Sequence, residues 1–560
     1  MARVWLLGAA LLLGCRAFAP AHSSSPQARV SELPNPAILP EGRSALEPPP
    51  LGEEPHPQRP GVPGNEQGAV PEVENGAAPP PPPPDPDARR AWLKARLDEV
   101  GSQAGLQGAK IGIMVADFET GQVLYARNEK MPLNAASNVK LVTSAAALSR
   151  LGPEFRWRTI VYGPSQAGRP VGPGGDLPGD LYLRGSGDPT LATEDLDGLA
   201  TSLASQGLKR VKGALVVDAS AFEGGNVGPG YDQKNENFAY RAPSSAASLN
   251  SNAVLVTVIP GPKAGAPARI TVEPPSPYFA VTGRITTAGL NGPAIPMVDT
   301  GDLDEQTRIT LSGRIRLGSE PRPFLRRVVH PELFIGQTFR EVLKRHGIVV
   351  DKPLRLGTVP AEGYRTLASH DSPALAVVLH DLNKRSSNFA AEQVLRTLGG
   401  EVVGRPGSWD KGLEAVARHL EQLGIARNAY RMNNGAGLYD SNRFTAEQLV
   451  TVMRAALRDF RIASEYLASF AVAGIDGTLG QRMGGTAAHR YVRAKTGTLA
   501  NVSSLSGVVG APGEKPLLFS MLVNDVPNPT SARVAQDRAA EAMVYYLDPN
   551  AWSTAAATAR

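Results

Sequence analysis

The sequence predicts an α/β (α+β) protein in which an antiparallel sheet packs between helices, with a large β-rich insertion. Two strand patterns near the start of the folded chain, at 111–117 and 122–126, are the first observation. The second is a run of helical patterns between 372 and 457, and the third is a set of strands followed by a helix that ends near 547. Because strands occur at both ends of this arrangement, we expect the two ends of the chain to meet in one sheet.

The individual elements follow from periodicity and from turn and capping residues. The expected helices are Arg89–Val100, a helix from Ser137 to Gly152, a helix beginning at Ser372-Pro373 with Ser372 as N-cap, Phe389–Leu398, Trp409–Leu423, Ala446–Leu457 after a Thr445/Gln448 capping box, and Ser531–Leu547. The expected strands at the C-terminal end are Tyr491–Ala494, Val502–Val509 and Leu517–Val523. Between Phe155 and Thr358, short β-branched runs separated by Gly/Pro turns predict a β-rich region with little helix.

Composition describes a globular protein without an evident nucleic-acid partner. Of 560 residues, 42% are hydrophobic and 20% are charged, and the net charge is only +5. No basic cluster with interleaved aromatic residues occurs, which argues against nucleic-acid binding. The single cysteine, Cys15, leaves no pair for a disulfide, so stability must come from the core.

The N-terminus predicts export. Residues 1–19 read as a signal peptide, with Arg3 before an apolar run from Val4 to Leu13 that is too short for a resident membrane helix. The stretch Leu12-Leu13-Gly14-Cys15 resembles the lipobox of bacterial lipoproteins, which implies lipidation of Cys15, a membrane anchor, and a periplasmic or cell-envelope location, with the outer membrane favoured. Ordinary secretion, with cleavage after Ala19, is the other interpretation.

Composition also divides the chain. Residues 20–87 are rich in Pro, Gly, Glu and Ala and predict a disordered linker. One domain is expected to begin in 88–160, to be interrupted by a β-rich inserted domain or domains at 161–360, and to resume at 361–550.

The helix start at Ser137 carries the first chemical motif. Ser137 and Lys140 form an S-x-x-K sequence, and a spacing of three places both side chains on one helix face. A lysine in this position can accept the serine proton, which makes Ser137 a candidate nucleophile and Lys140 a candidate base. A second S-x-x-K, Ser408 to Lys411, reads instead as an N-cap and a solvated lysine.

Two further motifs follow in order. Ser386-Ser387-Asn388 is an S-x-N on an expected helix–helix loop, and Lys495-Thr496-Gly497-Thr498 follows an expected strand. In the second motif, the lysine and the threonine hydroxyls suit a carboxylate, and the glycine allows a substrate backbone to approach closely. Each motif alone is a weak signal, but their order and their expected element types make coincidence improbable.

With these motifs the chain resembles the low-molecular-mass class C penicillin-binding proteins, the D-alanyl-D-alanine carboxypeptidase/endopeptidases. The spacing is the specific part, since 249 residues separate Ser137 from Ser386 and 109 separate Ser386 from Lys495. The resemblance covers about residues 90–548 and includes three further stretches: Arg184–Leu191, Ala242–Ala247 with Asn250 and Asn252, and Ala473–Leu479. The chain departs from the usual Asp-Gly-Ser-Gly-Leu at Asn434–Leu438, and the S-x-N centre is Ser387 instead of the common Asp.

The resemblance implies a penicillin-binding-protein/β-lactamase-like transpeptidase fold and a serine-type peptidase that acts on peptidoglycan stem peptides and binds β-lactams covalently. It implies that the Ser386 hydroxyl bridges Lys140 and Lys495 and passes a proton to the leaving amine. It also implies that Asn388 holds a substrate amide and that the Ser137 and Thr498 N–H groups form the oxyanion hole. Neither a metal nor a cofactor is expected. A β-lactamase and a non-catalytic wall-binding lipoprotein are the alternatives. The sequence does not decide whether carboxypeptidase or endopeptidase action dominates, and it does not decide the oligomeric state.

Overall fold

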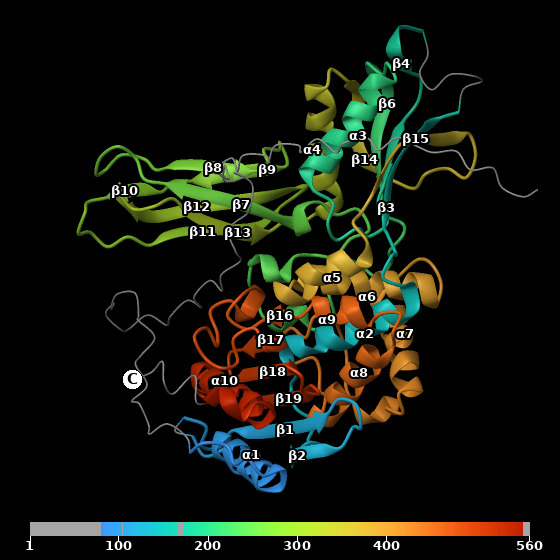
Figure 1. Ribbon diagram of the computed structural model, residues 1–560. Coiled ribbons are helices and arrows are strands. Elements are labelled where there is room, and N and C mark those ends of the chain that lie inside the picture. The colour runs from blue at the N-terminus through green and yellow to red at the C-terminus, as the bar shows by residue number, and fades with distance from the viewer. Residues whose placement is uncertain (1–79, 104, 166–172, 553–560) are drawn as a thin grey trace, which may run out of the picture. The chain divides into compact units, whose positions relative to one another are not determined.

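A computed structural model describes residues 80–103, 105–165 and 173–552, with elements labelled as in Figure 1. The predicted signal peptide with Cys15, and all of the predicted linker before residue 80, lie outside these residues. Helix α1 (Pro86–Val100) begins slightly before the expected boundary at residue 88, because Asp85 is its N-cap and accepts a hydrogen bond from the Ala88 N–H at 2.8 Å. Within the described ranges, no helix combines the length and the apolar composition needed to span a bilayer.

A six-stranded antiparallel sheet forms the centre of the structure that carries the motifs. Its strand order is β16-β17-β18-β19-β1-β2. The strands are β1 (Lys110–Asp117), β2 (Val123–Arg127), β16 (Ala471–Val472), β17 (Val492–Leu499), β18 (Val502–Val509) and β19 (Leu517–Asn524). Because β1 pairs with β19, with Lys110 opposite Asn524, the prediction that the two ends of the folded chain meet in one sheet is confirmed.

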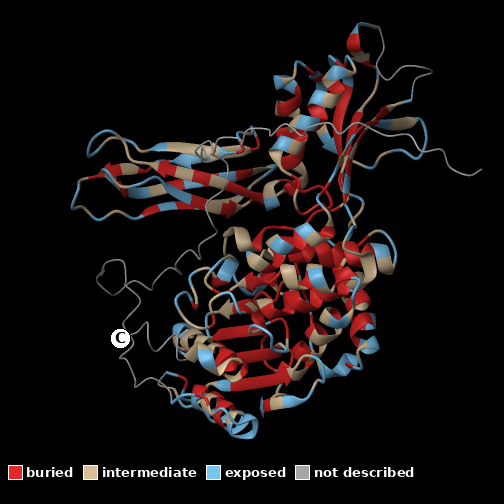
Figure 2. Cartoon of the chain, in the orientation of Figure 1, coloured by how far each residue is buried: buried red, intermediate tan, exposed pale blue. Residues whose placement is uncertain are grey.

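Helices cover both faces of this sheet (Figure 1). Helices α1 and α10 (Pro529–Leu547) pack on one face in a shared apolar core. On the other face, α8 (Ala446–Arg458) lies against β1, β18 and β19. The core on this side also includes α2 (Val139–Leu151), α5 (Leu375–Lys384), α6 (Asn388–Val402), α7 (Trp409–Gln422) and α9 (Ala463–Ala468). Strands β18 and β19 are buried along their whole length, as Figure 2 shows, so they form the covered centre of the sheet between the helices.

The interval between the first and second motifs holds three more sheets. One has the order β14-β6-β5-β3-β15 with β4 beside β6, and two smaller sheets have the orders β13-β7-β8 and β10-β12-β11, the latter with β9 beside β12. These strands are β3 (Arg158–Pro164), β4 (Asp176–Leu177), β5 (Leu181–Arg184), β6 (Arg210–Asp218), β7 (Ala253–Ile259), β8 (Arg269–Glu273), β9 (Phe279–Gly283), β10 (Thr286–Ala288), β11 (Pro296–Leu303), β12 (Gln306–Arg316), β13 (Arg322–Arg327), β14 (Val349–Leu356) and β15 (Tyr364–Asp371).

Two expectations about helices were wrong. The β-rich interval contains α3 (Thr193–Ser205) and α4 (Pro331–Arg345), whose apolar faces pack against its sheets. Ser372 is not the N-cap of α5, because α5 begins at Leu375 and the Ser372 hydroxyl instead accepts from the Trp157 N–H at 3.0 Å. The caps predicted at Ser408 and Thr445 are confirmed, including the reciprocal bonds of Thr445 and Gln448.

Candidate active site

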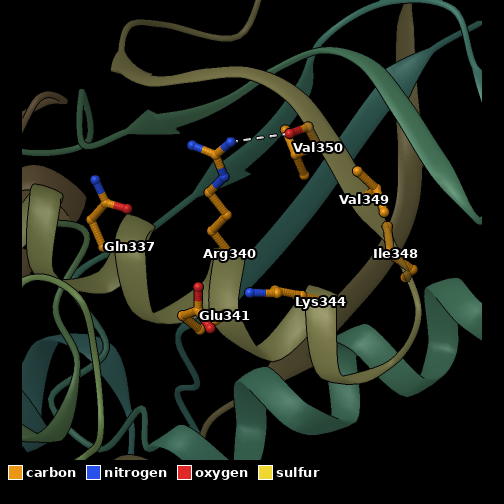
Figure 3. A pocket seen from close by; sticks show the side chains of 7 residues that line it. All are labelled: Gln337, Arg340, Glu341, Lys344, Ile348, Val349 and Val350. Atoms are coloured by element: carbon orange, nitrogen blue, oxygen red, sulfur yellow. Dashed lines mark hydrogen bonds between the residues drawn. The ribbon is translucent and has the colours of Figure 1, made fainter.

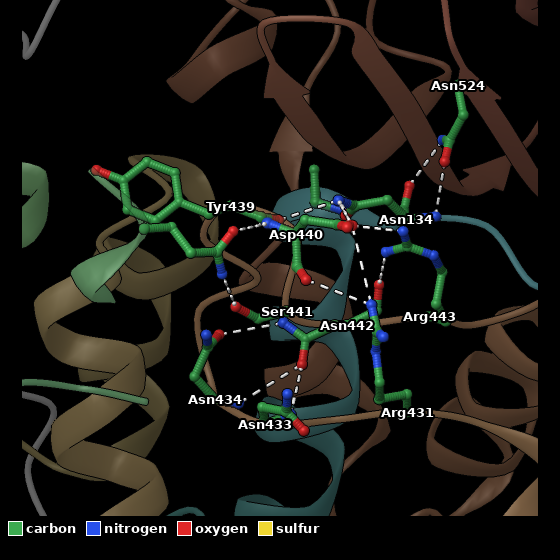
Figure 4. Close-up of polar contacts among 12 residues, drawn as sticks. Asn134, Arg431, Asn433, Asn434, Tyr439, Asp440, Ser441, Asn442, Arg443 and Asn524 are labelled. Carbon is green, nitrogen blue, oxygen red and sulfur yellow. Dashed lines mark hydrogen bonds and ion pairs between the residues drawn. The ribbon is translucent and has the colours of Figure 1, made fainter. Parts of the chain in front are cut away.

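Ser137 lies in a single 3₁₀ turn, η1 (Ala136–Asn138), that leads directly into α2. Asn134 shapes this turn, since its side-chain oxygen accepts from the Ala136 N–H at 2.9 Å and its backbone exchanges two hydrogen bonds with the Asn524 carboxamide (Figure 4). Asn138 fixes the other side, because its amide donates to the Lys495 carbonyl at 3.2 Å and to Ser504 Oγ at 2.9 Å. The turn is therefore tied to β17, β18 and β19.

Lys140 is completely buried in the first turn of α2 and points at Ser137. Its ammonium nitrogen lies 2.9 Å from Ser137 Oγ, 2.7 Å from Asn388 Oδ1 and 2.7 Å from the Ala436 carbonyl oxygen. Burial and the nearby Lys495 ammonium lower the pKa of Lys140 well below its usual value, while the Glu392 carboxylate opposes that shift. An amine with a lowered pKa can be neutral at working pH and can accept the proton of the adjacent hydroxyl.

The loop Asn434–Leu438 forms the wall beneath Lys140. Figure 4 shows Asn434 and Asn442 joined side chain to side chain, with the Asn434 oxygen accepting from Asn442 Nδ2 at 3.1 Å. The same oxygen accepts from the Gly437 N–H at 2.9 Å, and Asn434 Nδ2 donates to the Pro229 carbonyl at 3.0 Å. An aspartate at this position could not make this last donation, so Asn434 suits its surroundings in this chain.

Ser386 and Lys495 form a second serine–lysine pair. Lys495 is fully buried, and its ammonium donates to Ser386 Oγ at 2.9 Å and to the Thr496 carbonyl at 2.7 Å. Burial lowers the pKa of Lys495 to about 7. The resemblance implied that the Ser386 hydroxyl bridges both lysines; in the described residues it accepts from Lys495, whereas the bonds of Lys140 go to Ser137, Asn388 and Ala436.

Asn388 makes contacts that its motif did not predict. Its carboxamide oxygen accepts from Lys140, and its nitrogen donates to the Tyr240 carbonyl at 2.9 Å. Tyr240 belongs to η4 (Ala239–Arg241), between β6 and β7. Asn388 therefore holds the base in position and joins it to the inserted region, which leaves one amide hydrogen for a substrate.

The Lys495–Thr498 stretch runs along β17 beside Ser137. A Cβ on Gly497 would lie 2.2 Å from Ser504 Oγ and 2.9 Å from the Ser137 nitrogen, so the close approach that requires glycine here is to the Ser137 turn itself. The Thr496 hydroxyl donates to Thr478 Oγ1 at 2.7 Å. Thr498 is half-buried, and its hydroxyl accepts from the Arg533 guanidinium at 3.4 Å.

All eight predicted catalytic and substrate-binding residues thus lie on η1, α2, the α5–α6 connection, the start of α6 and β17. Lys140 contacts both Ser137 and Asn388, and Ser386 is bonded to Lys495. Comparison with known families gives a match for the chain, since the D-Ala-D-Ala carboxypeptidase 3 (S13) family matches residues 93–547.

The chain belongs to the D-Ala-D-Ala carboxypeptidase 3 (S13) family.

Relatives of known name agree with this assignment. A D-alanyl-D-alanine carboxypeptidase of an Actinomadura species is 35% identical over 82% of this chain and 86% of its own length. The D-alanyl-D-alanine carboxypeptidase DacB of Haemophilus influenzae is 26% identical over 75% of this chain and 86% of its own length. The crystal structure of penicillin binding protein 4 (dacB) from Haemophilus influenzae shares the fold, with a TM-score of 0.69 and 23% identity over 79% of this chain and 98% of that one. The S13 chain is therefore a serine-type D-Ala-D-Ala carboxypeptidase.

Several residues of this carboxypeptidase site escaped the sequence analysis. Asn138, Glu392, Ala436 and Arg533 all contact motif residues or their immediate partners. For Glu392 a signal was present, because it and Arg396 are two charges spaced four apart in an otherwise apolar helical pattern. No signal in the sequence pointed to Ala436, because this residue contacts Lys140 through its backbone carbonyl and not through its side chain.

A cavity elsewhere on the S13 chain takes no part in this site. It has a volume of about 370 Å³ and lies between α4 and the start of β14 (Figure 3). Its lining residues are Gln337, Arg340, Glu341, Lys344, Ile348, Val349 and Val350. None of them is a motif residue.

Proposed function

We propose that this carboxypeptidase works through an acyl-enzyme on Ser137 and acts on peptidoglycan stem peptides that end in D-Ala-D-Ala. The observation that supports this most directly is the 2.9 Å contact between Lys140 Nζ and Ser137 Oγ, made by a buried lysine whose pKa is lowered. A nucleophile within hydrogen-bond reach of a base that a third group orients is the arrangement that acyl transfer requires. Asn388 is that third group.

In the first half-reaction the Ser137 oxygen bonds to the carbonyl carbon of the penultimate D-alanine while Lys140 takes the hydroxyl proton. The N–H groups of Ser137 and Thr498 stabilise the resulting oxyanion. The proton on Lys140 then passes through the Ser386 hydroxyl, whose oxygen is held by Lys495, to the nitrogen of the terminal D-alanine. The C–N bond breaks, the D-alanine leaves as an amine, and Lys140 is neutral again. In the second half-reaction Lys140 takes a proton from a water molecule whose oxygen bonds to the ester carbonyl carbon. The ester C–O bond then breaks, and Lys140 returns that proton to the Ser137 oxygen, which regenerates the hydroxyl.

Recognition of the terminal carboxylate belongs to the end of β17. Lys495 is buried and bonded twice, so its ammonium acts mainly on Ser386. Thr498 is more accessible, and the Arg533 guanidinium beside it adds a positive charge. The same groups suit the carboxylate of a β-lactam, which acylates Ser137 in the same way. An internal D-alanyl cross-link lacks that carboxylate, so endopeptidase action would use this end of the site less.

The experiment is mass spectrometry of the protein after incubation with labelled penicillin. Ser137→Ala removes the nucleophile and abolishes both the adduct and peptidase activity, with the fold retained. Ser408→Ala, in the second S-x-x-K, is the matched control and keeps full labelling. An adduct that persists in Ser137→Ala, or that maps to Ser408, contradicts the assignment; rapid turnover of nitrocefin would identify a β-lactamase instead.

We further propose that the enzyme is exported and anchored to the outer membrane through a lipid on Cys15. The sequence supports this, because a lipobox-like stretch precedes a long proline-rich segment that can reach from a membrane to the wall. Cys15→Ser should release the protein in soluble or unprocessed form, with unchanged turnover of small soluble peptides and weaker action on intact sacculi. A wild-type protein that begins at Pro20 and carries no acyl mass contradicts the anchor.

A further inference from the structure

Glu392 is a buried carboxylate that the proposed mechanism does not use. It lies on α6 one turn after Asn388, with Arg396 one turn further, so all three side chains follow one stripe of the helix. Glu392 is only 2% exposed. A carboxylate is expensive to bury unless it is hydrogen-bonded and charge-balanced, so its partners indicate its purpose.

Four donors converge on the two Glu392 oxygens. The Trp409 indole N–H donates to one oxygen at 2.8 Å, and the Tyr231 hydroxyl donates to the other at 3.1 Å. The backbone N–H groups of Gly435 and Ala436 supply the remaining bonds, at 3.2 Å and 2.9 Å. Burial raises the pKa of Glu392, but each of these bonds opposes that shift by favouring the ionised form.

The two backbone donors connect Glu392 to the base. Ala436 gives its N–H to Glu392 and accepts from the Lys140 ammonium at its carbonyl, so a single peptide segment separates the carboxylate from the lysine. The Thr143 hydroxyl, on the same helix as Lys140, donates to the Gly435 carbonyl at 2.9 Å. A Cβ on Gly437 would lie 1.9 Å from the Ala136 carbonyl oxygen, so this loop also presses directly on the Ser137 turn.

We propose that Glu392 is a positioning residue for the reaction: its carboxylate clamps the loop whose carbonyl holds Lys140, and its negative charge keeps Lys140 basic enough to take the Ser137 proton. This inference rests on the proposed role of Lys140 as the base. Without Glu392, burial and the Lys495 ammonium would act on Lys140 unopposed.

The charged and titratable groups around Glu392 fit this role. Lys140 faces it from α2, Arg396 follows it on α6, and Tyr231 approaches from η3 (Tyr231–Gln233). The Arg396 guanidinium is directed away, since it donates to the carbonyls of Ser244 and Glu223 at 2.6 Å and 2.7 Å and stacks 4.0 Å from the Trp409 ring centroid. Lys495 lies beyond Lys140, and the carboxylates of Glu332 and Glu223 lie beyond Arg396.

The test is the pH dependence of penicillin acylation by the full-length enzyme. The midpoint of the acidic limb reports the pKa of the free base, because the base must be deprotonated to act. Removing a nearby negative charge lowers the pKa of a lysine, so Glu392→Gln should move that midpoint down by about one pH unit. The plateau rate should fall by about tenfold or more, because the loop that holds Lys140 is loosened.

Glu332→Gln is the matched control. Glu332 is a partly buried carboxylate that accepts from Asn226 at 2.9 Å and from Ser245 at 2.6 Å, and it is not among the charges that act on Lys140. Its midpoint should equal that of the wild type. An unmoved midpoint in Glu392→Gln, or an equal shift in Glu332→Gln, would overturn the inference, since a merely structural residue changes the rate without moving the limb.

A second variant covers the case in which Glu392→Gln does not fold. The double variant Tyr231→Phe/Trp409→Phe keeps the carboxylate but removes two donors, which raises the pKa of Glu392. Glu392 then becomes neutral as the pH falls, so the acidic limb shifts in the same direction, and an unmoved limb refutes the inference. A failure of the proposed function would be seen in a different experiment, because the Ser137→Ala protein would then still be labelled by penicillin.

Discussion

Two residues beside the reacting atoms hold left-handed backbone without being glycine. Ala136, immediately before the nucleophile, has φ 45°, and Ser386 has φ 60°. Such conformations cost about 1–3 kcal/mol each and persist only where the surroundings impose them. At Ala136 the Asn134 side chain and Gly437 supply that constraint. The position of Ser137 is therefore set by its neighbours and not by the intrinsic preference of its own turn.

The first prediction concerns Gly497. In Gly497→Ala the new methyl would meet Ser504 Oγ at 2.2 Å, the Ser137 nitrogen at 2.9 Å and the Ala135 oxygen at 3.0 Å, so β17 or the Ser137 turn must move. A displacement near 1 Å at reacting groups costs about 100-fold in rate, so penicillin acylation should slow by at least that factor. Stopped-flow acylation measures this. Gly510→Ala, where no atom lies within 4 Å of the new methyl, is the control; equal rates in both variants would contradict the argument.

At the scale of elements, α7 shows how one serine–lysine pair differs from another. Ser408 accepts from the Lys411 N–H at 3.3 Å, whereas the Lys411 ammonium turns outward to the Pro406 carbonyl at 2.6 Å and to Glu223. In the Ser137 pair the lysine side chain points at the hydroxyl. The sequence spacing is the same in the two pairs, but the serines lie at different places. Ser408 is the N-cap of α7, whereas Ser137 lies in the 3₁₀ turn that precedes α2.

The second prediction follows from this cap. Ser408→Ala leaves an N–H of the first turn of α7 without its acceptor, so the free energy of unfolding should fall by about 1 kcal/mol. Urea denaturation followed by circular dichroism measures the change. Penicillin labelling should remain at one adduct per chain; partial loss of labelling in the folded protein would mean that Ser408 has a role beyond the cap.

The elements also show what could be predicted. Strong local signals, such as the Ser408 cap and the Thr445/Gln448 capping box, predicted helix starts correctly. Helix α3 was missed although Leu196, Leu199, Ala200 and Leu203 follow a helical period, because neighbouring β-branched runs dominated the interpretation of that region. The motif residues were predicted from their spacing, but contacts made by backbone atoms, such as the Ala436 carbonyl, depend on a loop from elsewhere in the chain and leave no trace in side-chain identity.

For the whole molecule, the sheet and the helices around it bury two lysines. Pairing of β1 with β19 joins the two ends of the folded chain, and α2 and α6 close over the sheet face that carries the site. Lys140 and Lys495 are both completely buried as a result. Burying the two lysines that the reaction needs lowers the free energy of unfolding, because each ammonium loses its hydration on folding. The lowered pKa values of Lys140 and Lys495 reflect this cost.

The last prediction uses this cost. The pKa of Lys495 is about 7 in the folded protein, well below its value in an unfolded chain, so between these values the unfolded state binds more protons. The free energy of unfolding should therefore rise as pH rises above about 7, with a contribution from Lys495 of up to about 1.4 kcal/mol per pH unit. Lys495→Met removes this contribution and also lessens the depression of the Lys140 pKa, because the neighbouring positive charge is gone. Both effects have the same sign, so the stability of the wild type should gain on that of the variant as pH rises. Urea denaturation of both proteins at about pH 7.5 and about pH 9 measures the difference, and other titrating groups cancel in the comparison. Parallel stabilities at the two pH values would show that the Lys495 ammonium keeps its charge when the protein folds.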